Sequence, residues 1–212
     1  PSTDGAAIGP YDKEDQARWK DNLTTAAQRA EVGLDIIDCS PSAAIDSSPA
    51  MSPEDLEHHV TLGMQAADRE VNSGADLLIT SDVGIGSETV AAAVLGRITR
   101  TEPVAILGTR TGGGVMDDMW KARVSVVRDA MFRARNLEGW EVVQTIGSPS
   151  LAALIGFIAQ ATARRTPVLI DGPLAATAAV LAERSAPGVK GWLRAGSSSP
   201  EPAYALALKE LG

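Results

Sequence analysis

An acid followed by closely spaced glycines gives one stretch of the chain a strong chemical signature. Asp82 precedes Gly84 and Gly86, and Ser87 then opens an alanine-rich segment. The pattern predicts a strand, a tight turn and a helix that Ser87 caps. The first amides of a helix have no partner within it, and the helix dipole adds partial positive charge at that end. The sequence therefore predicts a phosphate or carboxylate site at this turn.

Two familiar phosphate-binding motifs do not account for this turn. No G-K-[ST] follows the glycines, which excludes a P-loop, and the third glycine of the dinucleotide fingerprint is missing. Glycines after a strand also serve as ordinary turn residues, and for any one loop that interpretation stays open.

Similar loops follow other predicted strands. Glycine, hydroxyl and acidic residues recur there: Gly112, Gly113, Gly114, Asp171, Gly172 and Ser197. In open parallel sheets the carboxyl ends of the strands form one edge, where ligands bind. These loops therefore predict a site for a small phosphorylated ligand. Asp117 and Asp118, which follow the glycines, are interpreted as a helix N-terminus rather than a catalytic pair.

The positions of apolar residues predict alternating strands and helices from about residue 76 onward. We expect helices over residues 13–30, 52–67, 87–98, 117–135, 149–163, 174–184 and from 199 onward. We expect strands over 34–39, 76–80, 103–107, 167–170 and 189–195. Such alternation predicts an α/β fold with a mostly parallel sheet. The chain of 212 residues is expected to form a single domain, with residues 1–12 as a loose arm.

Composition limits the classes of partner. The net charge is −8, which argues against nucleic acid or an anionic membrane surface as a partner. No apolar run reaches the length of about 18 residues typical of a membrane-spanning helix, and the first residues lack the features of a signal peptide. A single cysteine, Cys39, excludes a disulfide framework within the chain and favours a cytoplasmic location.

No metal site or cofactor site is predicted. His58 and His59 are adjacent on a predicted helix, so their side chains diverge by about 100°. We expect both to be exposed helix residues. Cys39 has no obvious partner in the sequence and is expected to be a small buried apolar group.

The loop motifs resemble those of the nicotinate-nucleotide–dimethylbenzimidazole phosphoribosyltransferase family. The E-M-G-I-G-N-T turn of that family is similar to residues 82–88, with Asp82 in place of Glu. Its G-[RT]-G-T-G-x-D-D segment is similar to residues 111–118, and its P-V-[VL]-[LV]-D-G-F segment to residues 167–173. A glycine-led helix at residues 146–156 and an S-H-x-S-A-E-like segment at 196–203 complete the series, in the family's order.

The resemblance implies a three-layer α/β fold with helices on both faces of the sheet, in a homodimer. It implies transfer of a 5-phosphoribosyl group from nicotinate mononucleotide, a small-molecule nucleotide, to a benzimidazole nitrogen, with release of nicotinate. Asp82 is the implied catalytic carboxylate, with Glu88 as a second candidate. The implied phosphate- and nucleotide-binding residues are Gly84, Ile85, Gly86, Ser87, Gly112, Gly113, Gly114, Asp171, Gly172 and Ser197.

One family segment has no counterpart in the sequence. The family carries an R-L-G-E-G segment with a proposed catalytic Glu, and no such segment precedes Gly212; Glu88 and Glu201 are candidate substitutes. Two alternatives follow. Besides the phosphoribosyltransferase activity, the protein could be a catalytically inactive nucleotide-binding homologue that serves as a sensor or subunit, or an α/β structural protein without a ligand.

Overall fold

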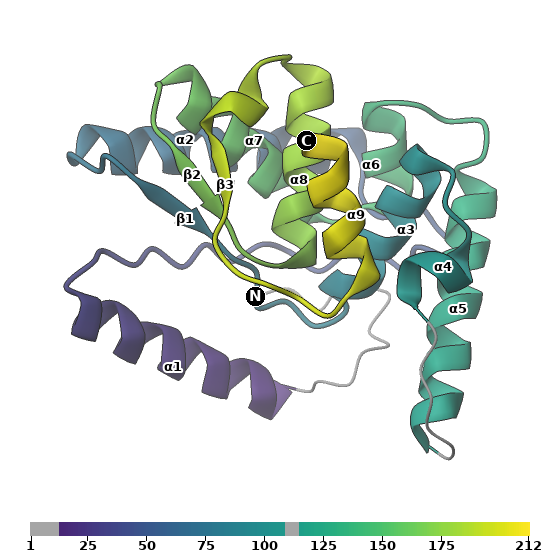
Figure 1. Ribbon diagram of the computed structural model, residues 1–212. Helices are drawn as coiled ribbons and strands as arrows, with labels where there is room; N and C mark the ends of the chain where they lie inside the picture. Colours follow the sequence, from purple (N-terminus) through teal and green to yellow (C-terminus); the bar gives the residue numbers. More distant parts are fainter. Residues whose placement is uncertain (1–12, 109–114) are drawn as a thin grey trace.

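A small parallel sheet lies beside a larger set of helices (Figure 1). The computed structural model describes residues 13–108 and 115–212. Within these residues β1 (Leu78–Thr80), β2 (Val168–Ile170) and β3 (Leu193–Ala195) pair in that order, all parallel. The α/β class with a parallel sheet is therefore confirmed. The predicted arm at residues 1–12 lies outside the described residues.

Most of the predicted helices are present within a few residues of their predicted ends. The longer helices are α1 (Lys13–Ala30), α2 (Pro53–Asn72), α3 (Ser87–Thr99), α5 (Val115–Arg133), α7 (Pro149–Ala163), α8 (Gly172–Ser185) and α9 (Pro202–Leu211). Two shorter helices are α4 (Pro103–Leu107) and α6 (Trp140–Ile146), the second of which the sequence patterns did not predict.

Side-chain caps explain why two of these helices begin where the sequence predicts. Ser52 accepts a hydrogen bond from the amide of Asp55, whose carboxylate accepts one from the Ser52 amide, so the capping box is closed. Ser148 accepts a hydrogen bond from the amide of Leu151 at 3.2 Å. In both helices a proline follows the cap, at the first helical position.

The predicted strand over residues 103–107 is wrong, because this segment is the short helix α4. Pro103 occupies its first turn, and the amide of Ile106 donates to the carbonyl of Glu102 at 3.0 Å. Ile106 and Leu107 are buried, so the apolar run reflects burial and not a strand. A run of five apolar residues fits a buried helical turn as well as a strand.

The predicted strand over residues 34–39 is also wrong. This segment has no regular secondary structure, and its Asp35 pairs with Arg69 of α2 at 3.1 Å. Apolar Leu34 and Ile36 are 44% and 42% exposed, so the alternation in the sequence does not correspond to a buried face. Of the strand predicted over residues 189–195, the first four residues form a 3-10 helix (Val189–Trp192), and only the last three, β3, join the sheet.

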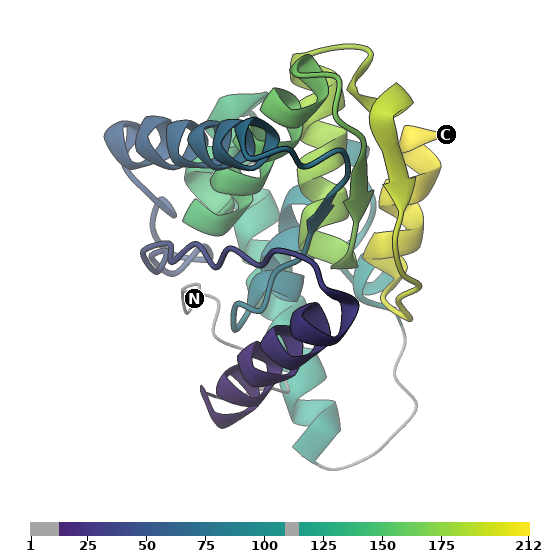
Figure 2. The same cartoon turned by 90° about the vertical axis from the view of Figure 1, so that its left-hand side faces the viewer.

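Helix α1 lies apart from the other helices, across the carboxyl ends of the strands (Figures 1 and 2). The buried core is built largely from α3, α7 and α8, and the alanines and valines of α3 and α8 are almost fully buried. Among the described residues no helix is both long enough and apolar enough to cross a bilayer. The sheet and the core together hold the loops after β1, β2 and β3 at one edge.

Candidate active site

The turn after β1 is organised around the side chain of Asp82. Its carboxylate accepts a hydrogen bond from the amide of Gly84 at 2.9 Å, two residues along the chain. The hydroxyl of Ser87 donates to the carbonyl of Gly84. A short acidic side chain that bonds to its own backbone two residues later is a common way to form such a turn.

The predicted capping role of Ser87 is wrong. The cap of α3 is Gly86, at φ 85°, and Ser87 is the first helical residue. A left-handed backbone is strained for any residue with a Cβ, which is why glycine occupies the cap. Gly86 has no side chain with which to cap the helix, and the amide of Ser87, at the first helical position, has no partner inside the helix.

The turn after β2 joins the first one directly. The amide of Asp171 donates to the carbonyl of Thr80 at 3.0 Å, and the Ser81 hydroxyl donates to the Asp171 carboxylate at 3.1 Å. Gly172, at φ 85°, begins α8 immediately afterwards. The carboxyl ends of two adjacent strands are therefore bonded to each other.

These two turns share a cavity of about 190 Å³. Its lining includes seven of the residues named from the sequence: Asp82, Gly84, Gly86, Ser87, Glu88, Asp171 and Gly172. Val83, Pro173 and Leu174 also line it. The structure thus brings together the acidic and glycine residues of two loops that are about 90 residues apart in the sequence, as the Ser81–Asp171 bond shows.

Other residues named from the sequence lie elsewhere. Ile85 is buried, with 6% of its surface exposed, and does not line the cavity. Ser197 is exposed, and its carbonyl accepts a hydrogen bond from the Tyr204 hydroxyl at 2.9 Å. Gly112, Gly113 and Gly114 lie outside the described residues.

Burial gives the acid of this site an altered affinity for protons. Burial of the carboxyl group raises the pKa of Asp82, and the nearby Ser87 side chain and Gly84 amide partly oppose the rise. The ionised form is disfavoured because the cavity replaces water around it. A carboxylate with a raised pKa is a stronger proton acceptor than an ordinary exposed one.

Helix α1 contributes to the site, which the sequence patterns did not predict. Trp19 lines the cavity, and the Gln16 side-chain amide donates to the carbonyl of Val83 at 2.9 Å. A tryptophan on an otherwise polar helix was the one available signal.

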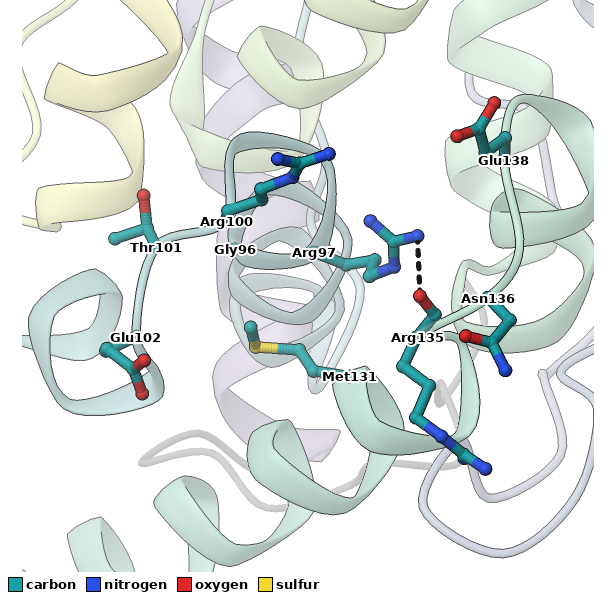
Figure 3. Close-up of a pocket in the computed structure, with 9 residues that line it drawn as sticks. All are labelled: Gly96, Arg97, Arg100, Thr101, Glu102, Met131, Arg135, Asn136 and Glu138. Atoms are coloured by element: carbon teal, nitrogen blue, oxygen red, sulfur yellow. Dashed lines mark hydrogen bonds between the residues drawn. The ribbon is translucent and has the colours of Figure 1, made fainter.

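A larger cavity of about 630 Å³ lies at the opposite end of α3 (Figure 3). The 13 residues of α3 place it about 20 Å from Ser87. Arg97, which lines it, donates to the carbonyls of Ala134 and Leu137, both at 2.7 Å, and to that of Arg135 at 3.1 Å. Its guanidinium therefore stabilises the chain after α5, and the strand-end loops do not reach this cavity.

The predictions for the histidines and the cysteine need correction. His59 is buried, at 4% exposure, because its ring lies between the Asp55 carbonyl (2.7 Å from Nδ1) and the Ser40 hydroxyl (3.3 Å from Nε2). His58 is exposed, as predicted. Cys39 is partly exposed rather than buried, because residues 31–41 run along the surface. No group of three or more potential metal ligands was found among the described residues.

Comparison with known proteins shows which family the chain belongs to. A family model described as phosphoribosyltransferase matches residues 21–212. The nicotinate-nucleotide–dimethylbenzimidazole phosphoribosyltransferase of Corynebacterium glutamicum is 48% identical over 170 residues, which are 79% of this chain and 47% of that protein. The enzyme of the same name from Mycobacterium tuberculosis is 43% identical over 173 residues, 81% of this chain and 47% of that protein. The chain belongs to the nicotinate-nucleotide–dimethylbenzimidazole phosphoribosyltransferase family.

The solved structure of a family member from Thermus thermophilus agrees with this assignment. It superposes with a TM-score of 0.86 at 25% identity, covering 100% of this chain and 71% of that one. The chain spans about half the length of the curated relatives it matches. In this phosphoribosyltransferase family member, six of the seven residues that resemble the family's first glycine turn, residues 82–88, line the cavity of about 190 Å³, called the strand-end cavity below.

Proposed function

We propose that the protein binds nicotinate mononucleotide at the strand-end cavity and transfers its 5-phosphoribosyl group to a benzimidazole-type base. Family membership and the names of the relatives support the reaction class. One observation of this chain carries the assignment to this cavity. Two long helices, α3 and α8, begin at its wall, and neither has a side-chain cap on its first amides.

The N-termini of α3 and α8, at the wall of the cavity, favour the binding of an anion there. Each end carries about half a positive charge together with amides that have no partner within the helix. The amide of Gly84 is already used by Asp82, so the phosphate would take the amide of Ser87 and those at the start of α8. Gly172 has no atom within 4 Å of the place where a Cβ would be, so the backbone there can be approached closely.

Asp82 is the proposed proton acceptor. The lone pair of one benzimidazole nitrogen attacks C1′ of the ribose, and the bond from C1′ to the nicotinate nitrogen breaks. Its electron pair stays with nicotinate, which leaves as a neutral pyridine ring bearing its carboxylate. The proton on the second benzimidazole nitrogen must then be lost, and the raised pKa of Asp82 suits it to accept that proton.

The size of the cavity limits what it would hold. Its 190 Å³ is less than the roughly 300–1,000 Å³ of typical small-molecule sites. We therefore assign the phosphate and ribose to the cavity and leave the two flat rings to the space beside Trp19, which lines the cavity from α1. A tryptophan at that position offers a face on which a ring can stack.

We further propose that the protein acts as a homodimer in the cytoplasm. Exposed apolar side chains support the dimer: Leu77 and Ile79, beside and in β1, are 47% and 61% exposed. Parallel sheets are usually covered on both faces. Exposed apolar side chains on one face of this sheet therefore favour its association with a second copy of the chain. Sedimentation of the purified chain over a range of concentrations tests the dimer.

Incubation with nicotinate mononucleotide and 5,6-dimethylbenzimidazole tests the activity. We expect nicotinate release that requires both substrates, together with a phosphoribosylated benzimidazole as the second product. Thermal unfolding with the nucleotide alone measures binding separately, because a ligand raises the unfolding temperature of the state that it binds. Stabilisation without release would limit the protein to binding, and the absence of both would refute the proposal.

A further inference from the structure

A buried arginine links two loops at the edge of the sheet. Arg123 of α5 is 5% exposed, and its Nε donates to the hydroxyl of Thr89 at 3.1 Å. Its Nη2 lies 3.9 Å from Oε2 of Glu201, an ion pair whose side chains are 6% and 17% exposed. That distance exceeds a hydrogen bond, and Nη2 has no hydrogen-bond partner among the described residues.

The two partners of Arg123 lie at the starts of two different helices, and only the first of these helices reaches the cavity. Thr89 follows Glu88, which lines the cavity, on the first turn of α3. Glu201 occupies the N-cap position of α9, at the end of the loop that follows β3. Because the guanidinium is a rigid fork of five donors, it can hold both partners in fixed directions. Arg123 therefore joins the loop after β1 to the loop after β3.

Other contacts already fix the backbone around this arginine. The Tyr204 hydroxyl donates to the carbonyl of Ser197, and Trp120 Nε1 donates to the carbonyl of Gly108 at 2.9 Å. A Cβ at Gly108 would lie 2.9 Å from Cγ of Pro202, so these segments are in close contact. With the backbone held in this way, Arg123 is left to determine the direction of the Glu201 side chain.

Stability alone does not explain a charged group in this position. A buried donor without a partner destabilises the folded state, and does so more strongly when it is charged. Apolar residues of similar volume often replace buried ion pairs without loss of stability. A buried polar group that lacks a partner in a native protein calls for a functional or structural reason.

We propose that Arg123 is a positioning residue of the strand-end site. It holds the Thr89 hydroxyl and the Glu201 carboxylate at a fixed separation, and so fixes the first turn of α3, whose Ser87 and Glu88 line the cavity where the nucleotide would bind. This proposal rests on the proposed function, because it assumes that the nucleotide binds at this edge. Arg123 acts through its partners and need not touch the ligand.

Affinity and stability, measured side by side on the same variants, test the proposal. Arg123→Met removes the fork while keeping an apolar stem, Arg123→Lys keeps the charge, and Glu201→Gln keeps the shape of the partner. Each is assayed for its Kd for nicotinate mononucleotide by calorimetry and for its unfolding midpoint. Arg97→Met is the matched control, since Arg97 also bonds several groups but lies at the far end of α3.

We expect Arg123→Met to weaken nucleotide binding by about tenfold to 100-fold, the range that corresponds to loss of a buried hydrogen bond made by a charged group. Arg123→Lys should recover part of this loss. The double variant with Glu201→Gln should be no weaker than Arg123→Met, since coupled residues are not additive. Arg97→Met should lower the unfolding midpoint and leave the Kd within about twofold.

The outcomes separate this proposal from the proposed function. If the wild-type protein fails to bind the nucleotide, the proposed function is refuted and this inference with it. If the wild type binds and Arg123→Met binds within about twofold, Arg123 has no positioning role, while the proposed function stands. If Arg123→Met does not fold, unchanged Kd values for Arg123→Lys and Glu201→Gln would refute the role.

Discussion

The amide of Gly84 donates a hydrogen bond of 2.9 Å to the carboxylate of Asp82, so the acid after β1 is held by its own turn. A glycine at this position avoids two tight contacts. A Cβ at Gly84 would lie 3.0 Å from the Ser87 hydroxyl oxygen and 3.1 Å from Asp82 Oδ2. The acid and the glycine therefore act as one unit, which presents a carboxylate to the cavity with little freedom to move.

Replacement of Asp82 by asparagine should separate binding from turnover. The asparagine carbonyl can still accept the Gly84 hydrogen bond, but the side chain no longer accepts a proton. We expect kcat to fall by about 100- to 10,000-fold, the usual contribution of a general base. The Kd for nicotinate mononucleotide should stay within about threefold. Steady-state kinetics and calorimetry on the same preparation provide both values.

Asp76→Asn is the control, because Asp76 is an exposed acid just before β1. It should leave both kcat and Kd unchanged. A kcat for Asp82→Asn within about threefold of wild type would remove Asp82 from the mechanism and direct attention to Glu88, the other acid of the cavity.

The same variant should be more stable than the wild type at neutral pH. Burial raises the pKa of Asp82 in the folded protein, so the folded state favours the protonated acid. This contribution to stability is complete below the unfolded pKa of about 3.9 and is lost as the pH rises through the folded value. Asp82→Asn avoids that loss, and each kcal/mol recovered should raise its unfolding midpoint by about 2–4 °C.

The pH dependence is the decisive part of this prediction. The difference between the midpoints of Asp82→Asn and wild type should be small near pH 4 and grow towards pH 8, as followed by circular dichroism. The exposed Asp76→Asn should not reproduce this trend. A difference that shrinks as the pH rises would mean that the ionised carboxylate is stabilised by its surroundings.

Trp19→Ala should weaken nucleotide binding with little effect on stability. Trp19 lines the cavity from α1, a helix that lies outside the main core. Loss of the ring should raise the Kd by about three- to tenfold, the range of a single aromatic contact. Arg18→Ala on the same helix is the control, since its side chain is 68% exposed. Equal Kd values for the two variants would exclude Trp19 from the ligand site.

Local signals in the sequence predict the elements whose ends are chemically marked. The start of α7 is predicted by Ser148 and the proline after it, and the start of α2 is predicted by the capping box at Ser52. The turns at residues 82–87 and 171–172 are also predictable, since an acid and glycines follow each apolar run. That the two turns share a cavity follows from the adjacency of β1 and β2.

Features that depend on distant partners are not predictable in this way. Residues 103–107 form a helix because Pro103 begins a turn and the core buries Ile106, and five apolar letters do not distinguish this from a strand. His59 is buried because a segment about 19 residues earlier supplies Ser40. The approach of α1 to the Asp82 turn, and the burial of Arg123 between two loops, likewise come only from tertiary structure.

Gly63 and Gly156 allow α2 and α7 to pack backbone against backbone. A Cβ at Gly156 would overlap the carbonyl of Val60 on α2, and a Cβ at Gly63 would overlap the carbonyl of Ala153 on α7. Alanine normally stabilises a helix interior by about 1 kcal/mol relative to glycine. Here the two helices would have to separate, and overpacking typically costs about 1–3 kcal/mol or more.

Gly156→Ala should therefore lower the unfolding midpoint, by about 2–4 °C for each kcal/mol lost. Gly33→Ala is the matched control, because nothing lies within 4 Å of its Cβ position and its φ is not left-handed. It should leave the midpoint unchanged or slightly raised. Because Gly63 and Gly156 lie in the same contact, the double variant should lose less than the sum of the two single losses: once one alanine has separated the helices, the second meets less resistance. Strict additivity would show that the two glycines serve separate contacts.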